Sequence, residues 1–213
     1  MENLSLHEIG CKCGTDKANN PHFWEGQNYL HIYSQYMEKL RDKPIRLLEI
    51  GVRGGNSLHM WEQYFPNAKI VGIDLNPGCA NKGGDNSEVI IGNQTDFCVL
   101  RKAVDALDGT IDIVVDDGSH LNELTLVTWS KLWQYVTSGG LYIFEDMQTS
   151  YEFEIVAAMK RGGWYHDYVH PDTKNVRRIV DKFLLEKIRN LDYKSGDIRA
   201  IHMHCMTYIM EKI

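Results

Sequence analysis

Several features that define other classes of protein are scarce or missing in this sequence of 213 residues. It contains no apolar run of the roughly 18–20 residues needed to cross a bilayer. Its first residues have neither the basic region nor the apolar region of a secretory signal. The five cysteines are odd in number and scattered, unlike the cysteines of a disulfide framework. We therefore expect a cytoplasmic protein with no membrane partner.

Positive charge is also in short supply. The chain has 23 Lys and Arg against 29 Asp and Glu, a formal net charge of −6. Because nucleic acid is a polyanion, this balance argues against DNA or RNA as a partner. Apolar residues make up 43% of the chain, enough for one substantial core. The composition therefore predicts a single domain over residues 1–213.

The residues that are present follow an alternating pattern from position 46 onward. Short aliphatic runs alternate with longer amphipathic stretches, which is typical of βαβ units around a parallel sheet. Strands are predicted at 46–50, 69–74, 88–92, 111–116 and 140–145. Helices are predicted at about 57–64, 96–107, 122–135 and 174–189, with caps at Asn56, Thr95 and 119–122, and Gly139-Gly140 starting the fifth strand. The tail 198–213 reads as an antiparallel hairpin around His204, so the fold class is α/β.

Two further regions surround this sheet in sequence. Residues 28–40 place Tyr29, Tyr33 and Tyr36 on one helical stripe, which predicts packing on the sheet first and contact with a ligand second. Residues 1–44 as a whole are interpreted as a helical cap or lid segment. Residues 152–197 are rich in aromatic side chains, and for these local core packing and a role in an acceptor pocket are equally good interpretations.

A glycine-rich turn follows the first predicted strand. Gly51, Gly54 and Gly55 lead directly into a helix, a geometry that lets backbone amides approach the negative part of a ligand. Asp74 ends the next strand, where a carboxylate can bind ribose hydroxyls. The glycine spacing does not match the G-x-G-x-x-G pattern of nicotinamide enzymes, and no G-K-[ST] of a P-loop follows. The turn therefore predicts a different nucleoside-containing ligand.

Acidic residues gather after two later strands. Asp116, Asp117 and His120 follow the fourth strand, and Glu145 and Asp146 follow the fifth. Because the carboxyl ends of neighbouring parallel strands meet at one edge, these side chains should converge, and such a cluster favours a hard cation such as Mg²⁺. The ion would lower the pKa of a hydroxyl, and neutral imidazole has a suitable pKa to take its proton. For Asp116, capping a turn is as good an interpretation as a ligand role.

At this point the chain resembles a known family, the magnesium-dependent sugar O-methyltransferases of macrolide biosynthesis. The resemblance covers most of the chain and is most specific at two motifs, Asp116-Asp117-Gly118-Ser119-His120 and Glu145-Asp146-x-Gln148-Thr149-Ser150-Tyr151. Weaker matches include Gly14-Thr15-Asp16-Lys17, Leu47-Leu48-Glu49-Ile50-Gly51, Val71-Gly72-Ile73-Asp74 and Gly92-x-Gln94-x-Asp96. The resemblance implies a Rossmann-like class I methyltransferase with a seven-stranded, mostly parallel sheet.

The resemblance also implies roles for individual residues. His120 would be the general base, while Asp117, Glu145 and Asp146 would hold Mg²⁺. S-adenosylmethionine would be the methyl donor, and Gln148 and Tyr151 would contact a sugar or glycoside acceptor. The residues expected to bind the donor are Thr15, Asp16, Glu49, Gly51, Asp74, Gln94, Asp96 and Asp116. A homo-oligomer, either dimer or tetramer, is expected.

Other functions stay open on the sequence alone. Within the same class, a catechol-type O-methyltransferase would use Mg²⁺ to bind two phenolic oxygens, and proteins associated with antibiotic hydroxylation share the motif set. A non-catalytic protein that binds S-adenosylmethionine is a different class, against which the intact set of Asp117, His120, Glu145 and Asp146 argues. The macrolide enzymes carry a long additional N-terminal domain without a counterpart in this sequence, so acceptor recognition is expected to differ.

Overall fold

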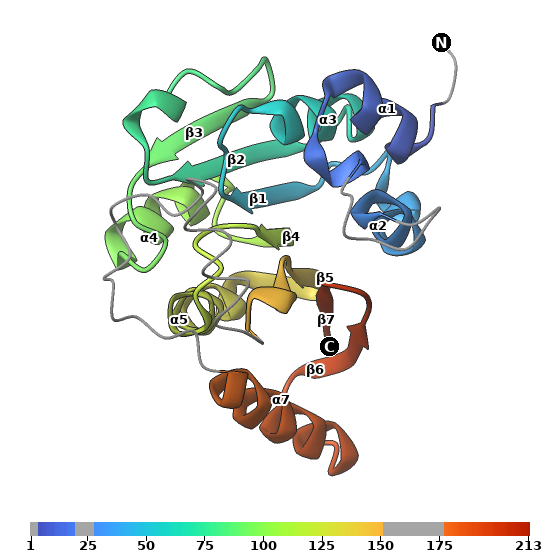
Figure 1. Cartoon of the computed structure of the whole chain (residues 1–213), viewed down its shortest axis with the longest axis vertical. Helices are drawn as coiled ribbons and strands as arrows, with labels where there is room; N and C mark the ends of the chain where they lie inside the picture. Colours follow the sequence, from blue (N-terminus) through green and yellow to red (C-terminus); the bar gives the residue numbers. More distant parts are fainter. Residues whose placement is uncertain (1–3, 20–27, 151–176) are drawn as a thin grey trace.

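The computed structural model describes residues 4–19, 28–150 and 177–213. A seven-stranded sheet with the order β3-β2-β1-β4-β5-β7-β6 runs through the molecule (Figure 1). Its first five strands pair in parallel, whereas β7 is antiparallel to both β5 and β6. The strands are β1 (Arg46–Ile50), β2 (Lys69–Asp74), β3 (Ser87–Ile91), β4 (Ile111–Asp116), β5 (Val136–Phe144), β6 (Ile198–Met203) and β7 (Tyr208–Lys212). The predicted α/β fold with a closing hairpin is confirmed.

Helices cover both faces of this sheet. The α-helices are α1 (Leu6–Cys13), α2 (Tyr29–Met37), α3 (Asn56–Tyr64), α4 (Phe97–Ala106), α5 (Asn122–Leu132) and α7 (Arg177–Asp192). Single 3₁₀ turns include η1 (Asp16–Ala18), η2 (Glu38–Leu40), η3 (Pro77–Cys79), η4 (Trp133–Tyr135) and η5 (Met147–Ser150). None of these described helices is long and apolar enough to span a membrane.

The core has two halves because side chains alternate along each buried strand. On β1, Leu47 packs into the core beneath α1, α2 and α3, while its neighbour Leu48 packs into the core beneath α4, α5 and α7. On β4, Val115 and Val114 divide between the two halves in the same way. Burial on both faces explains why these strands read as continuous apolar runs rather than alternating ones.

Several local predictions were wrong in detail. The N-caps of α3 and α4 are Gly55 and Asp96, not Asn56 and Thr95, and α5 begins after Leu121 without a side-chain cap. Strand β5 begins at Val136, not at the predicted Gly140. The Gly139-Gly140 pair lies within the strand, at an irregular stretch of its pairing with β4. The sequence analysis also missed α1, although its capping box of Ser5 and Glu8 is a readable start signal.

The amino-terminal helices lie beside α3 at one side of the sheet (Figure 1). Helix α2 buries Tyr29, Ile32 and Tyr33 in the first half of the core, so the predicted packing of this stripe is confirmed. Packing leaves the hydroxyl ends of the tyrosines at the carboxyl edge of the sheet. The contacts that they make there belong to the candidate site.

Candidate active site

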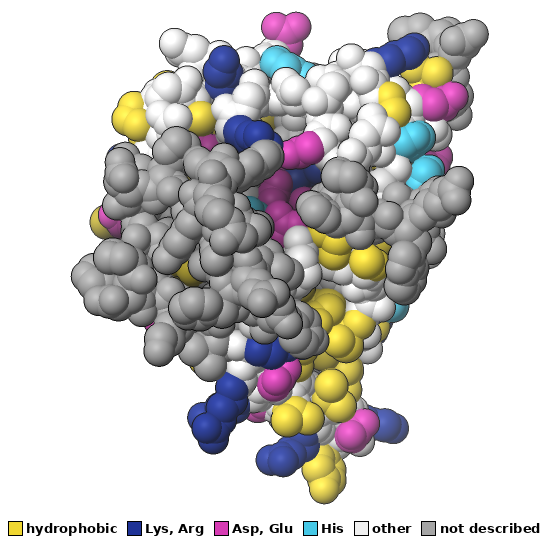
Figure 2. All heavy atoms as spheres, viewed as in Figure 1, with side chains coloured by type: hydrophobic (Ala, Val, Ile, Leu, Met, Phe, Trp, Pro, Cys, Tyr) yellow, Lys and Arg dark blue, Asp and Glu magenta, His cyan; other side chains and the backbone are white. Residues whose placement is uncertain are grey.

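The ends of β1, β4 and β5 meet at the carboxyl edge of the sheet. The Asp117 amide donates to the Ile50 carbonyl (2.9 Å), and the Glu145 amide donates to the Asp116 carbonyl (3.1 Å). Gly51 has φ +92°, and a Cβ atom there would overlap the Asp117 carbonyl oxygen. Glycine therefore allows the turn after β1 to lie directly against the loop after β4. Acidic side chains gather in a recess at the centre of this face (Figure 2).

His120 lies between two of these carboxylates. Its Nε2 atom is 3.9 Å from Asp117 Oδ1 and 3.5 Å from Asp146 Oδ2. Asp117, His120 and Asp146 each offer a ligand atom, all within 4.8 Å of one another, which makes them a group able to hold a metal ion. His120 (φ 55°) and Asp146 (φ 54°) both have left-handed backbones, a strained conformation that is concentrated at functional sites.

A lysine that the sequence analysis did not assign to the site reaches into this cluster. The Lys17 ammonium lies 2.5 Å from Asp117 Oδ2, 2.9 Å from Glu145 Oε2 and 3.6 Å from Glu49 Oε1. Its side chain is only 2% exposed. The Gly14-Thr15-Asp16-Lys17 motif was the one sequence feature that singled this lysine out. Its contacts could not be predicted from it, because Lys17 lies 100 residues from Asp117 and 128 from Glu145 along the chain.

The cluster perturbs the proton affinity of each member. Burial would lower the pKa of Lys17, but the three carboxylates outweigh it and hold that pKa well above its usual value. Burial raises the pKa of Asp117, against the opposing charges of Lys17 and His120. Burial and the charge of Asp117 raise the pKa of Glu145 well above its usual value. The positive charge of Lys17 therefore does not fully offset the cost of burying these two carboxylates.

Asp146 differs from its neighbours. Burial acts to raise its pKa, but the charge of His120 and hydrogen bonds from Gln148 and Tyr29 outweigh burial and leave the pKa below its usual value. Gln148 Nε2 donates to Asp146 Oδ1 at 2.8 Å, so the residue predicted to contact substrate holds a site carboxylate in this structure. Tyr151, the other predicted substrate residue, lies outside the described residues.

Helix α2 supplies two tyrosine hydroxyls to the cluster. Tyr29 donates to Asp146 Oδ1 (2.7 Å), and Tyr33 donates to Glu145 Oε1 (2.6 Å). Both oxygens of Glu145 are therefore bound from the amino-terminal part of the chain, one by Tyr33 and one by Lys17. The apolar stripe of α2 thus serves packing along its rings and the site at its hydroxyls.

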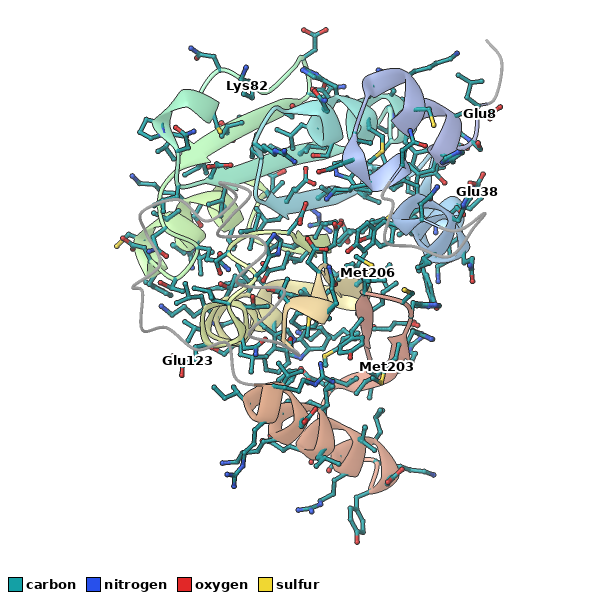
Figure 3. The ribbon with its side chains drawn as sticks, in the orientation of Figure 1. Glu8, Glu38, Lys82, Glu123, Met203 and Met206 are labelled. Carbon is teal, nitrogen blue, oxygen red and sulfur yellow. The ribbon has the colours of Figure 1, made fainter. Side chains whose placement is uncertain are left out.

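The β6–β7 hairpin supports the site from the other side. Met206 lies in the turn of the hairpin (Figure 3). Its carbonyl accepts a hydrogen bond (2.9 Å) from the amide of Met147, the residue that follows Asp146. Thr207 donates to the Phe144 carbonyl (2.8 Å), and His204 binds the hydroxyl of Tyr36 on α2 (2.7 Å). The loop that carries Asp146 is therefore held between the hairpin and α2.

Two of the predicted donor-binding residues, Asp74 and Asp16, contact the glycine-rich turn after β1. Asp74 ends β2, where its Oδ2 accepts from the Val52 and Arg53 amides (2.9 Å each) and its Oδ1 from the Asn76 amide (2.8 Å). Asp16 forms an exposed ion pair with Arg53 (2.8 Å). Asp74 is thus in the expected position, and its carboxylate shapes the glycine-rich turn.

Others of this set are buried supports. Gln94 accepts from the Ser119 amide (2.8 Å) and donates to Thr128 (3.1 Å), which fixes the loop that leads to His120. Glu49 is fully buried and accepts from Ser57 (2.8 Å).

Three more predicted residues also make local contacts. Thr15 caps η1, and Asp96 caps α4. Asp116 does not join the Lys17 cluster, because its carboxylate accepts from Tyr142 (2.7 Å). Burial raises the pKa of Asp116 to about 7 and that of Glu49 to about 7.

The sheet order, the antiparallel hairpin at its end and the glycine-rich turn after β1 define a class I methyltransferase fold. A solved structure with this fold is MycE, a methyltransferase of the mycinamycin pathway, in complex with Mg, SAH and mycinamycin VI. The two structures superpose with a TM-score of 0.75 at 27% identity, over 99% of this chain and 55% of the MycE chain.

Curated proteins agree with this likeness, although no protein-family model matches the chain. The 8-demethyl-8-alpha-L-rhamnosyl tetracenomycin-C 2'-O-methyltransferase of Streptomyces olivaceus is 33% identical over 188 residues, 83% of this chain and 45% of that protein. The mycinamicin VI 2''-O-methyltransferase of Micromonospora griseorubida is 36% identical over 133 residues, 56% of this chain and 31% of that protein. The chain is therefore a relative of the macrolide and tetracenomycin sugar O-methyltransferases, and it spans less than half the length of these two curated relatives.

Proposed function

We propose that this chain is an S-adenosylmethionine-dependent and Mg²⁺-dependent O-methyltransferase that acts on a hydroxyl of a sugar or a glycosylated small molecule. The convergence of Asp117, His120 and Asp146 at the carboxyl edge of the sheet carries this proposal. Carboxylate oxygens are the ligands that Mg²⁺ prefers, and an imidazole beside them is able to take a proton. The relatives described above give the reaction class.

The charges in the cluster fit a divalent cation. Four carboxylates, those of Glu49, Asp117, Glu145 and Asp146, face one buried lysine and one histidine. Buried carboxylates without enough positive charge are costly, and the raised pKa values of Asp117 and Glu145 reflect that cost. Asp117 and Asp146 would hold the ion, with Glu145 beside them as the third predicted ligand. When bound, Mg²⁺ would orient the acceptor and lower the pKa of its hydroxyl.

His120 would accept the proton of that hydroxyl at Nε2, the ring nitrogen that faces Asp117 and Asp146. Asp146 would keep the ring in place and stabilise the imidazolium that forms. The deprotonated oxygen would then attack the methyl group of S-adenosylmethionine in line, the bond from that methyl group to sulfur would break, and S-adenosylhomocysteine would leave. The contribution of the protein is therefore position and charge rather than a covalent intermediate.

The donor would lie along the turns after β1 and β2. The open carboxyl edge of an α/β sheet is where nucleoside ligands bind, and Asp74 ends β2 at that edge. The amides of Val52 and Arg53 donate to this carboxylate, which fixes the shape of the glycine-rich turn beside it. MycE, which shares the fold, was solved with SAH, the product form of this donor.

The proposal is tested by calorimetric titration of S-adenosylmethionine with and without Mg²⁺, and by methyl transfer to sugar nucleotides, glycosides and catechols. Mg²⁺-dependent transfer to a glycoside is the expected result. Transfer only to catechols would replace the sugar acceptor with a phenolic one. Donor binding without any transfer would favour an accessory protein, and no donor binding would overturn the proposal. Light scattering on the same preparation checks the predicted dimer or tetramer.

A further inference from the structure

Both the backbone and the side chain of Lys17 are held by neighbouring residues. It belongs to η1, where its amide donates to Thr15 Oγ1 (3.4 Å) and the carbonyl of the next residue, Ala18, accepts from Asn28 (2.8 Å). Its side chain is almost completely buried, and its ammonium forms ion pairs with three carboxylates, those of Glu49, Asp117 and Glu145. The proposed chemistry gives it no step, so its position calls for a separate explanation.

In each of the two carboxylates nearest to Lys17, one oxygen binds the ammonium and the other faces a different partner. Oδ2 of Asp117 binds the ammonium, and Oδ1 is left on the side of His120 and Asp146. Glu145 is held from both sides, with Oε2 on Lys17 and Oε1 on the Tyr33 hydroxyl. The rotation of both carboxylates is thus set by two side chains from the amino-terminal part of the chain.

We propose that Lys17 and Tyr33 are positioning residues of the metal site, which hold Asp117 and Glu145 so that Asp117 Oδ1 faces the place shared with His120 and Asp146. This inference rests on the proposed function, because it assumes that a divalent cation binds there. Hydrogen-bonding partners of metal ligands are part of a metal site, and their loss commonly weakens metal binding about 10- to 100-fold.

The direction in which cation affinity changes when Lys17 is replaced distinguishes a positioning role from a simple counter-charge. Lys17 carries a positive charge within 2.5 Å of Asp117, so removing it should strengthen cation binding if only Coulomb repulsion matters. If Lys17 positions the carboxylates, its removal frees Asp117 and Glu145 to rotate, and binding becomes weaker. The two explanations therefore predict changes of opposite sign.

The test measures Mn²⁺ affinity by the electron paramagnetic resonance signal of free Mn²⁺, which does not depend on turnover. Lys17→Met should weaken binding about 10- to 100-fold, and Tyr33→Phe should weaken it in the same direction by less, since it frees only Glu145. Lys69→Met is the matched control, because Lys69 pairs with Asp108 at 2.8 Å on an exposed surface and should bind Mn²⁺ like the unaltered chain. Calorimetry with S-adenosylmethionine and thermal unfolding followed by circular dichroism confirm that each variant is folded.

Each result decides the inference. Unchanged or tighter Mn²⁺ binding in folded Lys17→Met overturns it and leaves Lys17 as a counter-charge. If Lys17→Met does not fold, Tyr33→Phe decides alone, and an unchanged affinity in that variant overturns the inference. No Mn²⁺ binding by the unaltered chain would instead remove the metal from the proposed function, and the inference with it.

Discussion

The two ends of the sheet differ in how their charged side chains are paired. At the amino end, Asp112 on β4 accepts hydrogen bonds from the Arg46 amide and Nε (2.9 Å each), from Arg46 Nη2 (3.1 Å) and from Thr137 (2.9 Å). Burial acts to raise the pKa of Asp112, but these partners outweigh it and the pKa is lowered. One acid and one base satisfy each other there.

At the carboxyl end, several carboxylates share one lysine. Burial raises the pKa of Asp117 and of Glu145, and the charge of Lys17 does not fully offset it. The amino end therefore joins strands and contributes stability, whereas the carboxyl end keeps an excess of negative charge that a bound cation would relieve. The contrast separates a structural ion pair from the cluster proposed to bind a metal, although both lie on the same three strands.

Removal of divalent metal should have the largest effect and should act on the carboxyl end alone. We expect EDTA to reduce methyl transfer to the background rate, because the acceptor hydroxyl then loses the ion that lowers its pKa. Added Mg²⁺ should restore the rate in a radiometric assay. Full turnover in EDTA would show that the acidic cluster serves another purpose.

His120→Ala should have the second-largest effect. We expect kcat to fall about 10²- to 10⁴-fold, the range that general-base catalysis contributes. Binding of S-adenosylmethionine by calorimetry should be retained, because the proposed donor site lies along the turns after β1 and β2. His59→Ala is the matched control, since His59 is an exposed residue of α3 that contacts Glu62 (3.4 Å). Undiminished kcat in His120→Ala would remove His120 from the mechanism.

Asp112→Asn should act on the amino end alone. It should lower the stability of the protein and leave the site at the carboxyl end intact. We expect the free energy of unfolding in urea to fall by about 1–3 kcal/mol, because the hydrogen bonds from Arg46 and Thr137 lose their charged acceptor. Turnover measured under folded conditions should stay near that of the unaltered chain. A large drop in turnover with no loss of stability would contradict the division between the two ends.

The smallest expected effect is the pH dependence of the stability that the charge of Asp112 contributes. Because the folded pKa of Asp112 is below its unfolded value, its contribution is complete above the unfolded pKa and is lost as pH falls through the folded pKa. The stability difference between the unaltered chain and Asp112→Asn should therefore shrink as pH falls from about 5 to below about 3. Urea unfolding across this range measures it, and a constant difference would mean that the charge of Asp112 is not what stabilises the amino end.

Local patterns were enough to predict most of the sheet. Strands β1, β2 and β4 were predicted at their observed bounds because each is a short apolar run that ends at a turn or acid. The start of β5 was not, because a Gly-Gly pair has no side chains to distinguish a break from a continued strand. Helix α1 was missed since it is short and its apolar residues contact α2 and α3, which the local pattern does not reveal.

The sequence by itself determined where most of the strands lie along the chain. It also placed Asp117, His120, Glu145 and Asp146 just after strand ends, and parallel strands bring such residues to one edge. Only the tertiary structure decided which partners those residues meet. Lys17 and Tyr33 reach Asp117 and Glu145 across 100 and 112 residues of chain, through the packing of η1 and α2. Packing also turned Asp116 toward Tyr142, away from its neighbour Asp117. A side chain's position along a strand is a local property, whereas its contacts depend on burial shared by distant segments.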